Sequence, residues 1–175
     1  MRIEINEAGS EAFCREVVHV IGQHRRLLKK PEAKLKNQMK GFKGSIILCA
    51  VLLVLNVAMA MAWGWDTLSW VAVVLMAVLI LLNAACLIQY LRMVKGMMAR
   101  TEPAVLTVDE DGVELQRGDQ CFRLGWSSIA FARVFEESMC FVPGDTVGVL
   151  IAVDRRYASQ VLEAMRKCAP DVNVY

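Results

Sequence analysis

The chain has 175 residues, of which 56% are hydrophobic and 22% are charged, with a mean hydropathy of +0.40. This composition excludes a disordered tail protein, and the length excludes a large multi-domain enzyme. The formal net charge of +2 conceals strong segregation, because residues 25–43 carry eight basic side chains against Glu32, whereas residues 101–175 carry more acidic than basic groups. Different parts of the chain are therefore expected to face different surroundings.

The first 43 residues are predicted to form a cytoplasmic N-terminal segment. Hydrophobic and polar residues alternate from Arg2 to Asn6, which is typical of a short strand. Ser10 is a suitable N-cap for an amphipathic helix that ends or bends at Pro31, which has no backbone N–H. The apolar residues of this helix recur at helical spacing: Phe13, Val17, Val20, Ile21 and Leu28. Residues 33–42 are expected to add a turn or two of helix that leads into the membrane.

A basic stretch follows the amphipathic helix and is called the basic collar below. Its members are Arg25, Arg26, Lys29, Lys30, Lys34, Lys36, Lys40 and Lys43. Each Lys or Arg near anionic lipid contributes about 1 kcal/mol of membrane attraction. The collar either recognises anionic lipids or only sets the membrane topology, and we favour the second interpretation.

Residues 44–91 are predicted to form a transmembrane hairpin of two helices, at about 44–65 and 67–91, followed by a linker at 92–102. The first helix has 22 residues without a charge and the second has 25, with Asp66 between them. About 20 helical residues cross a bilayer core. Two helices that are apolar on all sides could instead be buried in a soluble protein, but the rest of this chain is too small to cover them.

The flanks of the two helices predict their orientation. Basic residues flank both outer ends and none lies in the turn, so the positive-inside rule places both termini in the cytoplasm of a multi-pass protein. Three tryptophans surround the turn, where aromatic side chains mark the far interface, and a tyrosine marks the near one. These residues are Trp63, Trp65, Trp70 and Tyr90.

Two asparagines, Asn56 and Asn83, lie inside the predicted spans. Buried amides in lipid often link helices by hydrogen bonds. Counted from the turn, the two residues differ in depth by on the order of 12 Å, so they do not bond each other within one hairpin. Asn56 either meets its own copy across the two-fold axis of a homodimer or bonds a backbone carbonyl of its own helix, and both alternatives stay open.

Residues 103–175 are predicted to form a small cytoplasmic α+β domain. Turn signals such as Asp111–Gly112 separate six short runs that are typical of antiparallel strands. These runs are Ala104–Val108, Val113–Arg117, Cys121–Trp126, Ile129–Glu136, Met139–Val142 and Val147–Val153. Asp154 then caps a helix that ends near Cys168 and packs on the sheet. Whether the N-terminal strand joins this sheet is left open by the sequence.

Four segments of this domain resemble the C-terminal domain of YcxB-like bacterial membrane proteins. They are Thr107–Val113, Gly125–Ile129, Glu136–Val142 and Ile151–Tyr157. The order of an N-terminal segment, two membrane helices and this domain is also similar. The resemblance implies a pleckstrin-homology-like (PH-like) sheet and helix, and a location in the bacterial cytoplasmic (inner) membrane. The chain departs from the family pattern at the start of the final helix, where the usual proline and lysine are absent.

The sequence has no recognisable catalytic or metal-binding set. His19 and His24 do not share a helical face, and both are expected to be solvated. The six cysteines are scattered and are expected to be free thiols, a disulfide between Cys121 and Cys140 being less favoured. No cofactor is implied, and the acidic C-terminal part disfavours nucleic-acid binding.

The leading hypothesis is therefore a non-catalytic membrane protein that presents a small domain for protein–protein interaction or assembly. The candidate partner contacts are Arg155, Arg156, Asp109 and Asp111. Alternatives are an oligomeric transport or channel component, suggested by the intramembrane asparagines, and an anionic-lipid sensor that uses the basic collar.

Overall fold

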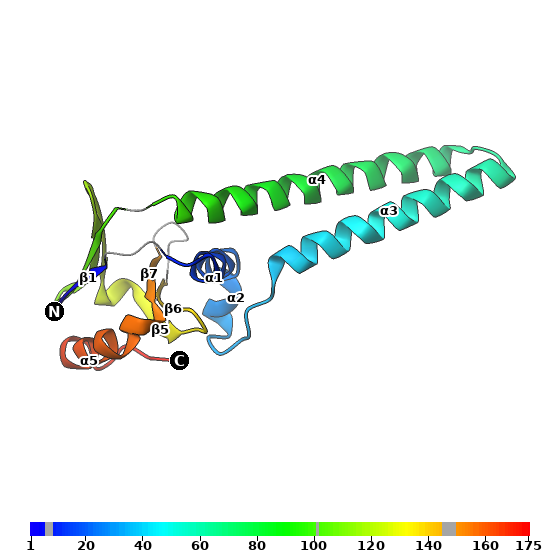
Figure 1. Ribbon diagram of the computed structural model, residues 1–175. Helices are drawn as coiled ribbons and strands as arrows, with labels where there is room; N and C mark the ends of the chain where they lie inside the picture. The colour runs from blue at the N-terminus through cyan, green and yellow to red at the C-terminus, as the bar shows by residue number, and fades with distance from the viewer. Residues whose placement is uncertain (6–8, 101, 145–149) are drawn as a thin grey trace. The chain divides into compact units, whose positions relative to one another are not determined.

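The computed structural model describes residues 1–5, 9–100, 102–144 and 150–175, which form two compact units. The first unit, called the folded domain, combines Met1–Leu35 with Val94–Tyr175, and the second unit, the helical hairpin, is Lys36–Met93. The hairpin is thus inserted into a single domain that both ends of the chain build (Figure 1). This division differs from the expected one, in which residues 1–43 and 103–175 were separate parts.

The first sheet of the folded domain contains four antiparallel strands in the order β1-β2-β3-β4. The strands are β1 (Arg2–Ile5), β2 (Ala104–Val108), β3 (Gly112–Arg117) and β4 (Gln120–Gly125). Arg2 lies opposite Thr107 and Ile5 opposite Ala104, so the N-terminal strand pairs with the first strand after the hairpin. Alternation along β1 buries Ile3 and Ile5. Asn6, the expected last residue of this strand, lies outside the described residues.

The second sheet has three antiparallel strands, β5 (Ile129–Val134), β6 (Ser138–Pro143) and β7 (Ile151–Asp154), in the order β5-β6-β7. Every residue of β6 is buried, which explains why this strand reads as a continuous apolar run rather than an alternating one. Near the C-terminus, Ala132 N donates to Asn173 O at 2.9 Å and Tyr175 N donates to Ala132 O at 3.0 Å. Residues 147–149, the expected start of the last strand, lie outside the described residues.

The helices of the folded domain are α1 (Glu11–Gly22), α2 (His24–Lys29) and α5 (Ala158–Cys168), with short 3₁₀ turns at Trp126–Ser128 and Arg155–Tyr157. Ser10 is the N-cap of α1, as predicted, since its Oγ accepts from Phe13 N at 3.0 Å. The single helix predicted to reach Pro31 is interrupted at Gln23, directly after Gly22, a poor helix former. Asp154 caps the second 3₁₀ turn and not α5 itself.

Two hydrophobic cores lie on opposite faces of the second sheet. The first core fills the space between the two sheets and α5, and its largest fully buried side chains include Leu106, Met139, Phe141, Ile151 and Met165. The second core joins the other face of the second sheet to α1 and α2. Its buried members are Val20, Leu27, Phe131, Phe135, Cys140 and Val142. The N-terminal helices are therefore part of the domain's packing.

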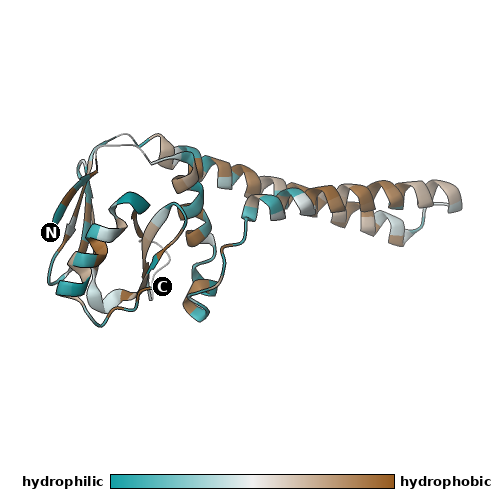
Figure 2. Cartoon of the chain, turned by 60° about the horizontal axis from the view of Figure 1, so that its bottom comes forward, coloured by the Kyte–Doolittle hydropathy of each residue, from teal (hydrophilic) through white to brown (hydrophobic). Residues whose placement is uncertain are grey.

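The helical hairpin consists of α3 (Gln38–Trp63, 26 residues) and α4 (Thr67–Met98, 32 residues). Asn37 caps α3, so the helix begins later than residue 33, and α4 continues through residues that were expected to form a linker. The turn contains Gly64 at φ +98°, and Asp66 Oδ1 accepts from Ser69 N at 2.8 Å. Both helices are long and apolar enough to cross a membrane, and hydrophobic residues run along them (Figure 2). Most of their apolar side chains are exposed.

Glu16 fastens α1 to the turn between β5 and β6. Its carboxylate accepts hydrogen bonds from Glu136 N at 3.1 Å, Glu137 N at 3.0 Å and Ser138 Oγ at 2.6 Å. One side chain therefore satisfies three donors more than a hundred residues away in the chain. This contact joins the N-terminal and C-terminal parts of the folded domain.

Replacing Glu16 with alanine is expected to lower the free energy of unfolding by about 1–3 kcal/mol, because three donors lose a charged acceptor. Chemical denaturation of the solubilised full chain, followed by near-UV circular dichroism, measures this change. The matched control is Glu11→Ala, which removes an exposed ion pair with Arg15 and a charge in the first turn of the same helix, and is expected to cost less than about 1 kcal/mol. Equal losses in the two variants would contradict a clamping role for Glu16.

Candidate functional site

The basic collar is a solvent-facing set of side chains. All eight of its residues are exposed. Arg26 Nη1 donates to Gln23 Oε1 at 3.1 Å. The acceptor is a neutral amide, so this contact does not neutralise the charge of Arg26. Four members lie on or directly after α2, and Lys36, Lys40 and Lys43 belong to the helical hairpin.

The acidic candidate contacts, Asp109 and Asp111, lie in the turn between β2 and β3. Asp109 Oδ1 accepts from Asp111 N at 3.0 Å and from Gly112 N at 2.9 Å, so this side chain builds the turn. Arg123 Nη2 is 3.0 Å from Asp111 Oδ2 and 3.7 Å from Asp109 Oδ2. The charge of this turn is therefore partly balanced within the sheet.

The basic candidate contacts, Arg155 and Arg156, also have local partners. Arg155 Nη1 donates to Glu136 O at 3.1 Å. Arg156 Nε is 3.7 Å from Asp154 Oδ1, and its guanidinium lies 4.9 Å from the centre of the Tyr157 ring. Both residues form the 3₁₀ turn before α5. Among the described residues, no hydrogen bond or ion pair links Arg155 or Arg156 to the acidic turn of Asp109 and Asp111.

The two asparagines of the hairpin differ in their hydrogen bonding. Asn83 Nδ2 donates to Leu79 O of its own helix at 2.8 Å. Asn56 Oδ1 is shielded from solvent and has no hydrogen-bond partner in the part of the chain that the structure describes. An own-helix carbonyl bond is thus observed for Asn83 and not for Asn56.

The aromatic residues of the hairpin lie at its turn and in α4. Trp63 ends α3 and has 82% of its surface exposed. Trp65 and Trp70 form a ring pair with centroids 4.6 Å apart across the start of α4. Tyr90 lies in the C-terminal half of α4.

The expectation that both histidines are solvated is wrong for His24. This side chain is only 5% exposed, and its Nε2 is 2.8 Å from Pro143 O. In the sequence, Val20, His24 and Leu27 follow the spacing of one face of a continuous helix, which would have indicated burial of His24. The pKa of His19, by contrast, is lowered mainly by partial burial and further by Arg15.

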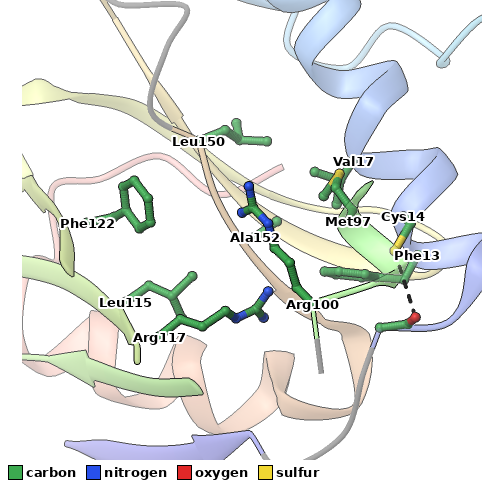
Figure 3. A pocket seen from close by; sticks show the side chains of 11 residues that line it. Phe13, Cys14, Val17, Met97, Arg100, Leu115, Arg117, Phe122, Leu150 and Ala152 are labelled. Carbon is green, nitrogen blue, oxygen red and sulfur yellow. Dashed lines mark hydrogen bonds between the residues drawn. The ribbon is translucent and has the colours of Figure 1, made fainter. Parts of the chain in front are cut away.

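The folded domain contains a cavity of about 270 Å³ that the sequence did not reveal (Figure 3). Five segments of the chain line it, from α1, the end of α4, β3, β4 and the start of β7. The lining residues are Gly9, Phe13, Cys14, Val17, Met97, Arg100, Leu115, Arg117, Phe122, Leu150 and Ala152. Because the lining residues range from Gly9 to Ala152, no local motif could have identified the set.

Two arginines give the cavity its charge. Arg100 follows α4 and Arg117 ends β3, and both guanidinium groups project into the space between apolar side chains (Figure 3). Burial is the main cause that lowers the pKa of Arg117, and the neighbouring charge of Arg100 lowers it further. Arg117 Nε is buried and has no hydrogen-bond partner among the residues that the structure describes. The site therefore holds two cations close enough to repel each other.

Cys14 also lines the cavity and senses the charge of Arg117. Its thiol is 1% exposed and donates weakly to Gly9 O at 3.8 Å. Burial raises the pKa of Cys14, and Arg117 opposes this shift only in part. A thiol that stays protonated is a poor nucleophile, so the cavity is better suited to binding than to covalent chemistry.

No family model, curated protein or solved structure matches the chain.

Proposed function

We propose that the protein is a non-catalytic integral membrane protein of the bacterial cytoplasmic membrane that presents the folded domain to a protein partner. One observation carries the proposal: a single domain is interrupted by two long helices whose apolar surfaces are uncovered. Exposed apolar surface on this scale is stable in lipid but not in water. The hairpin serves as the anchor, and the folded domain faces the cytoplasm.

The pairing of β1 with β2 supports a common side for both termini. These strands share a sheet although the whole hairpin lies between them. A hairpin that leaves and re-enters one domain must return to the side from which it started. By the positive-inside rule, the basic collar supports the cytoplasm as that side.

A PH-like fold is part of the same proposal. The four-stranded and three-stranded antiparallel sheets followed by α5 support it, as does the resemblance to YcxB-like proteins. The fold alone names no partner.

Topology reporters test the membrane part of the proposal. An alkaline phosphatase fused after Trp65 is expected to be active on the periplasmic side, and the same enzyme fused after Tyr175 is expected to be inactive. The full chain should stay in the membrane pellet after carbonate extraction, whereas a control chain lacking residues 36–93 should be soluble. Activity of both fusions, or extraction of the full chain by carbonate, would refute the anchor.

Affinity capture in mild detergent tests the interaction part. A specific membrane or cytoplasmic protein is expected to co-purify with the full chain, and Asp111→Lys combined with Arg155→Glu should weaken the capture by at least about tenfold if the proposed contacts mediate it. Lys167→Glu, which alters an exposed helix residue paired with Glu163, is the control. Recovery of the bait alone would count against an interaction role.

Self-association through Asn56 is a further part of the proposal. The shielded Oδ1 of Asn56 has no partner among the described residues, and an asparagine of a second copy would supply a donor. Asn56→Leu is therefore expected to reduce the dimer fraction in detergent by about two- to tenfold, measured by analytical ultracentrifugation. Asn83→Leu is the control, because Asn83 bonds its own helix. An unchanged dimer fraction in Asn56→Leu would contradict self-association through Asn56.

Recognition of anionic lipid by the basic collar is a second candidate function, favoured by the exposure of all eight side chains. Replacing Arg25, Arg26, Lys29 and Lys30 with glutamine should reduce the anionic lipid that co-purifies with the chain, as quantified by mass spectrometry. A variant that keeps its lipid but inverts its topology would show that the collar only orients the hairpin.

A further inference from the structure

The cavity of the folded domain has the features of a ligand site. Membrane anchoring by the hairpin does not require such a site. Its walls combine two converging cations with apolar side chains from α1, β3 and β4 (Figure 3). Among the described residues, neither Arg100 nor Arg117 forms an ion pair within 4.0 Å. Glu102 raises the pKa of Arg117 electrostatically but makes no such contact with it. The two arginine charges are therefore not balanced by a direct ion pair within the described residues.

Holding two guanidinium groups together in a half-enclosed space is unfavourable unless an anion joins them. Burial desolvates Arg117, and its Nε has no acceptor in the described chain. A phosphate or carboxylate has several acceptor oxygens and accepts forked hydrogen bonds from guanidinium groups. Such a group would accept from Arg117 Nε and relieve the repulsion between the two arginines at the same time.

The apolar part of the lining determines what the ligand carries beside its anionic group. Phe13, Val17, Leu115 and Phe122 surround the charged centre with side chains that exclude water from an apolar substituent. A volume of about 270 Å³ lies just below the usual range for small-molecule sites, roughly 300–1,000 Å³. The cavity is large enough for an anionic head with a short length of chain, and too small to enclose a whole phospholipid.

We infer that this cavity binds the phosphate or carboxylate head of an amphipathic anion, with Arg100 and Arg117 clamping the head and Phe13, Leu115 and Phe122 contacting the first part of its chain. The same chemistry is offered by a soluble alkyl phosphate or carboxylate and by an anionic lipid. Arg100 lies two residues beyond Met98, the last residue of α4, so a lipid source is close if α4 is in the membrane. Only the lipid source rests on the proposed function, because the soluble source needs no bilayer.

Isothermal titration of the full chain in phosphatidylcholine nanodiscs tests the site, with hexyl phosphate and inorganic phosphate as probes. Hexyl phosphate is expected to bind at least about tenfold more tightly than inorganic phosphate, because only hexyl phosphate uses the apolar wall. Arg117→Gln and Arg100→Gln should each weaken hexyl phosphate binding by at least about tenfold. Arg123→Gln, which changes an arginine of β4 outside the cavity, should leave binding unchanged.

Two further comparisons make each outcome decisive. Arg100 is exposed, so Arg100→Gln keeps the test valid even if Arg117→Gln unfolds the domain. Thermal unfolding of the full chain, compared between phosphatidylcholine nanodiscs and nanodiscs that also contain phosphatidylglycerol, separates the two sources. A rise in Tm with phosphatidylglycerol that requires Arg100 indicates a lipid ligand, and hexyl phosphate binding without such a rise indicates a soluble one. Hexyl phosphate binding that is absent, or that is equal in wild type and Arg100→Gln, would overturn the inference.

Discussion

Ile3→Asp is expected to lower the free energy of unfolding of the folded domain by about 3–5 kcal/mol, a large share of the roughly 5–15 kcal/mol of a typical domain. Ile3 is 7% exposed and belongs to the core between the two sheets, opposite Leu106 of β2. A carboxylate at this position would lie in an apolar environment without a partner. The denaturant midpoint of the full chain, solubilised in a neutral detergent, measures the loss.

The matched control changes the neighbouring residue of the same strand. Glu4 is exposed on the other face of β1, so Glu4→Gln is expected to change the stability by less than about 0.5 kcal/mol. If Ile3→Asp and Glu4→Gln behaved alike, β1 would not belong to the core. In that case the N-terminal segment would be a separate part of the molecule after all.

Phe141→Ala is expected to destabilise the folded domain by about 3–5 kcal/mol. Phe141 is fully buried at the centre of β6, and its ring meets Trp126 edge-on with centroids 6.3 Å apart. Removing the ring leaves a cavity that the strand cannot fill, because β6 is buried at every position and has neighbours on both sides in its sheet. The near-UV circular dichroism signal of the tryptophans should weaken in parallel.

Phe122→Ala is the matched control for this prediction. Phe122 is a half-buried residue of β4 that lines the cavity, so truncating its ring removes fewer contacts. Its loss of stability is expected to be less than half of that for Phe141→Ala. A larger effect at Phe122 would mean that the core does not lie between the two sheets as described.

Sequence periodicity was enough to predict most elements of the folded domain. Alternation and turn chemistry placed β2 at Ala104–Val108, as observed, and placed β3 to within one residue. The two apolar helices were evident from their length and lack of charge. Such local patterns depend on which face of an element is buried, and the spacing of apolar residues in one sequence indicates that face.

Long-range contacts could not be predicted from the sequence. Nothing local to β1 specifies β2 as its partner or sets Arg2 opposite Thr107, because register depends on the assembled core. The role of Glu16 was missed for the same reason, since its three donors lie in residues 136–138. The arginine-containing cavity forms only when five segments of the chain pack together, so no single segment indicates it.

One experiment tests most directly that the hairpin is inserted into a single domain built from both ends of the chain. Residues 36–93 are replaced by a flexible glycine–serine linker of about 20 residues, which has a root-mean-square span of roughly 25 Å. The expected result is a soluble, folded protein in which nuclear Overhauser effects connect Ile3 with Leu106 across β1 and β2. A protein in which residues 1–35 are unstructured while residues 94–175 keep their fold would contradict a single domain built from both ends of the chain.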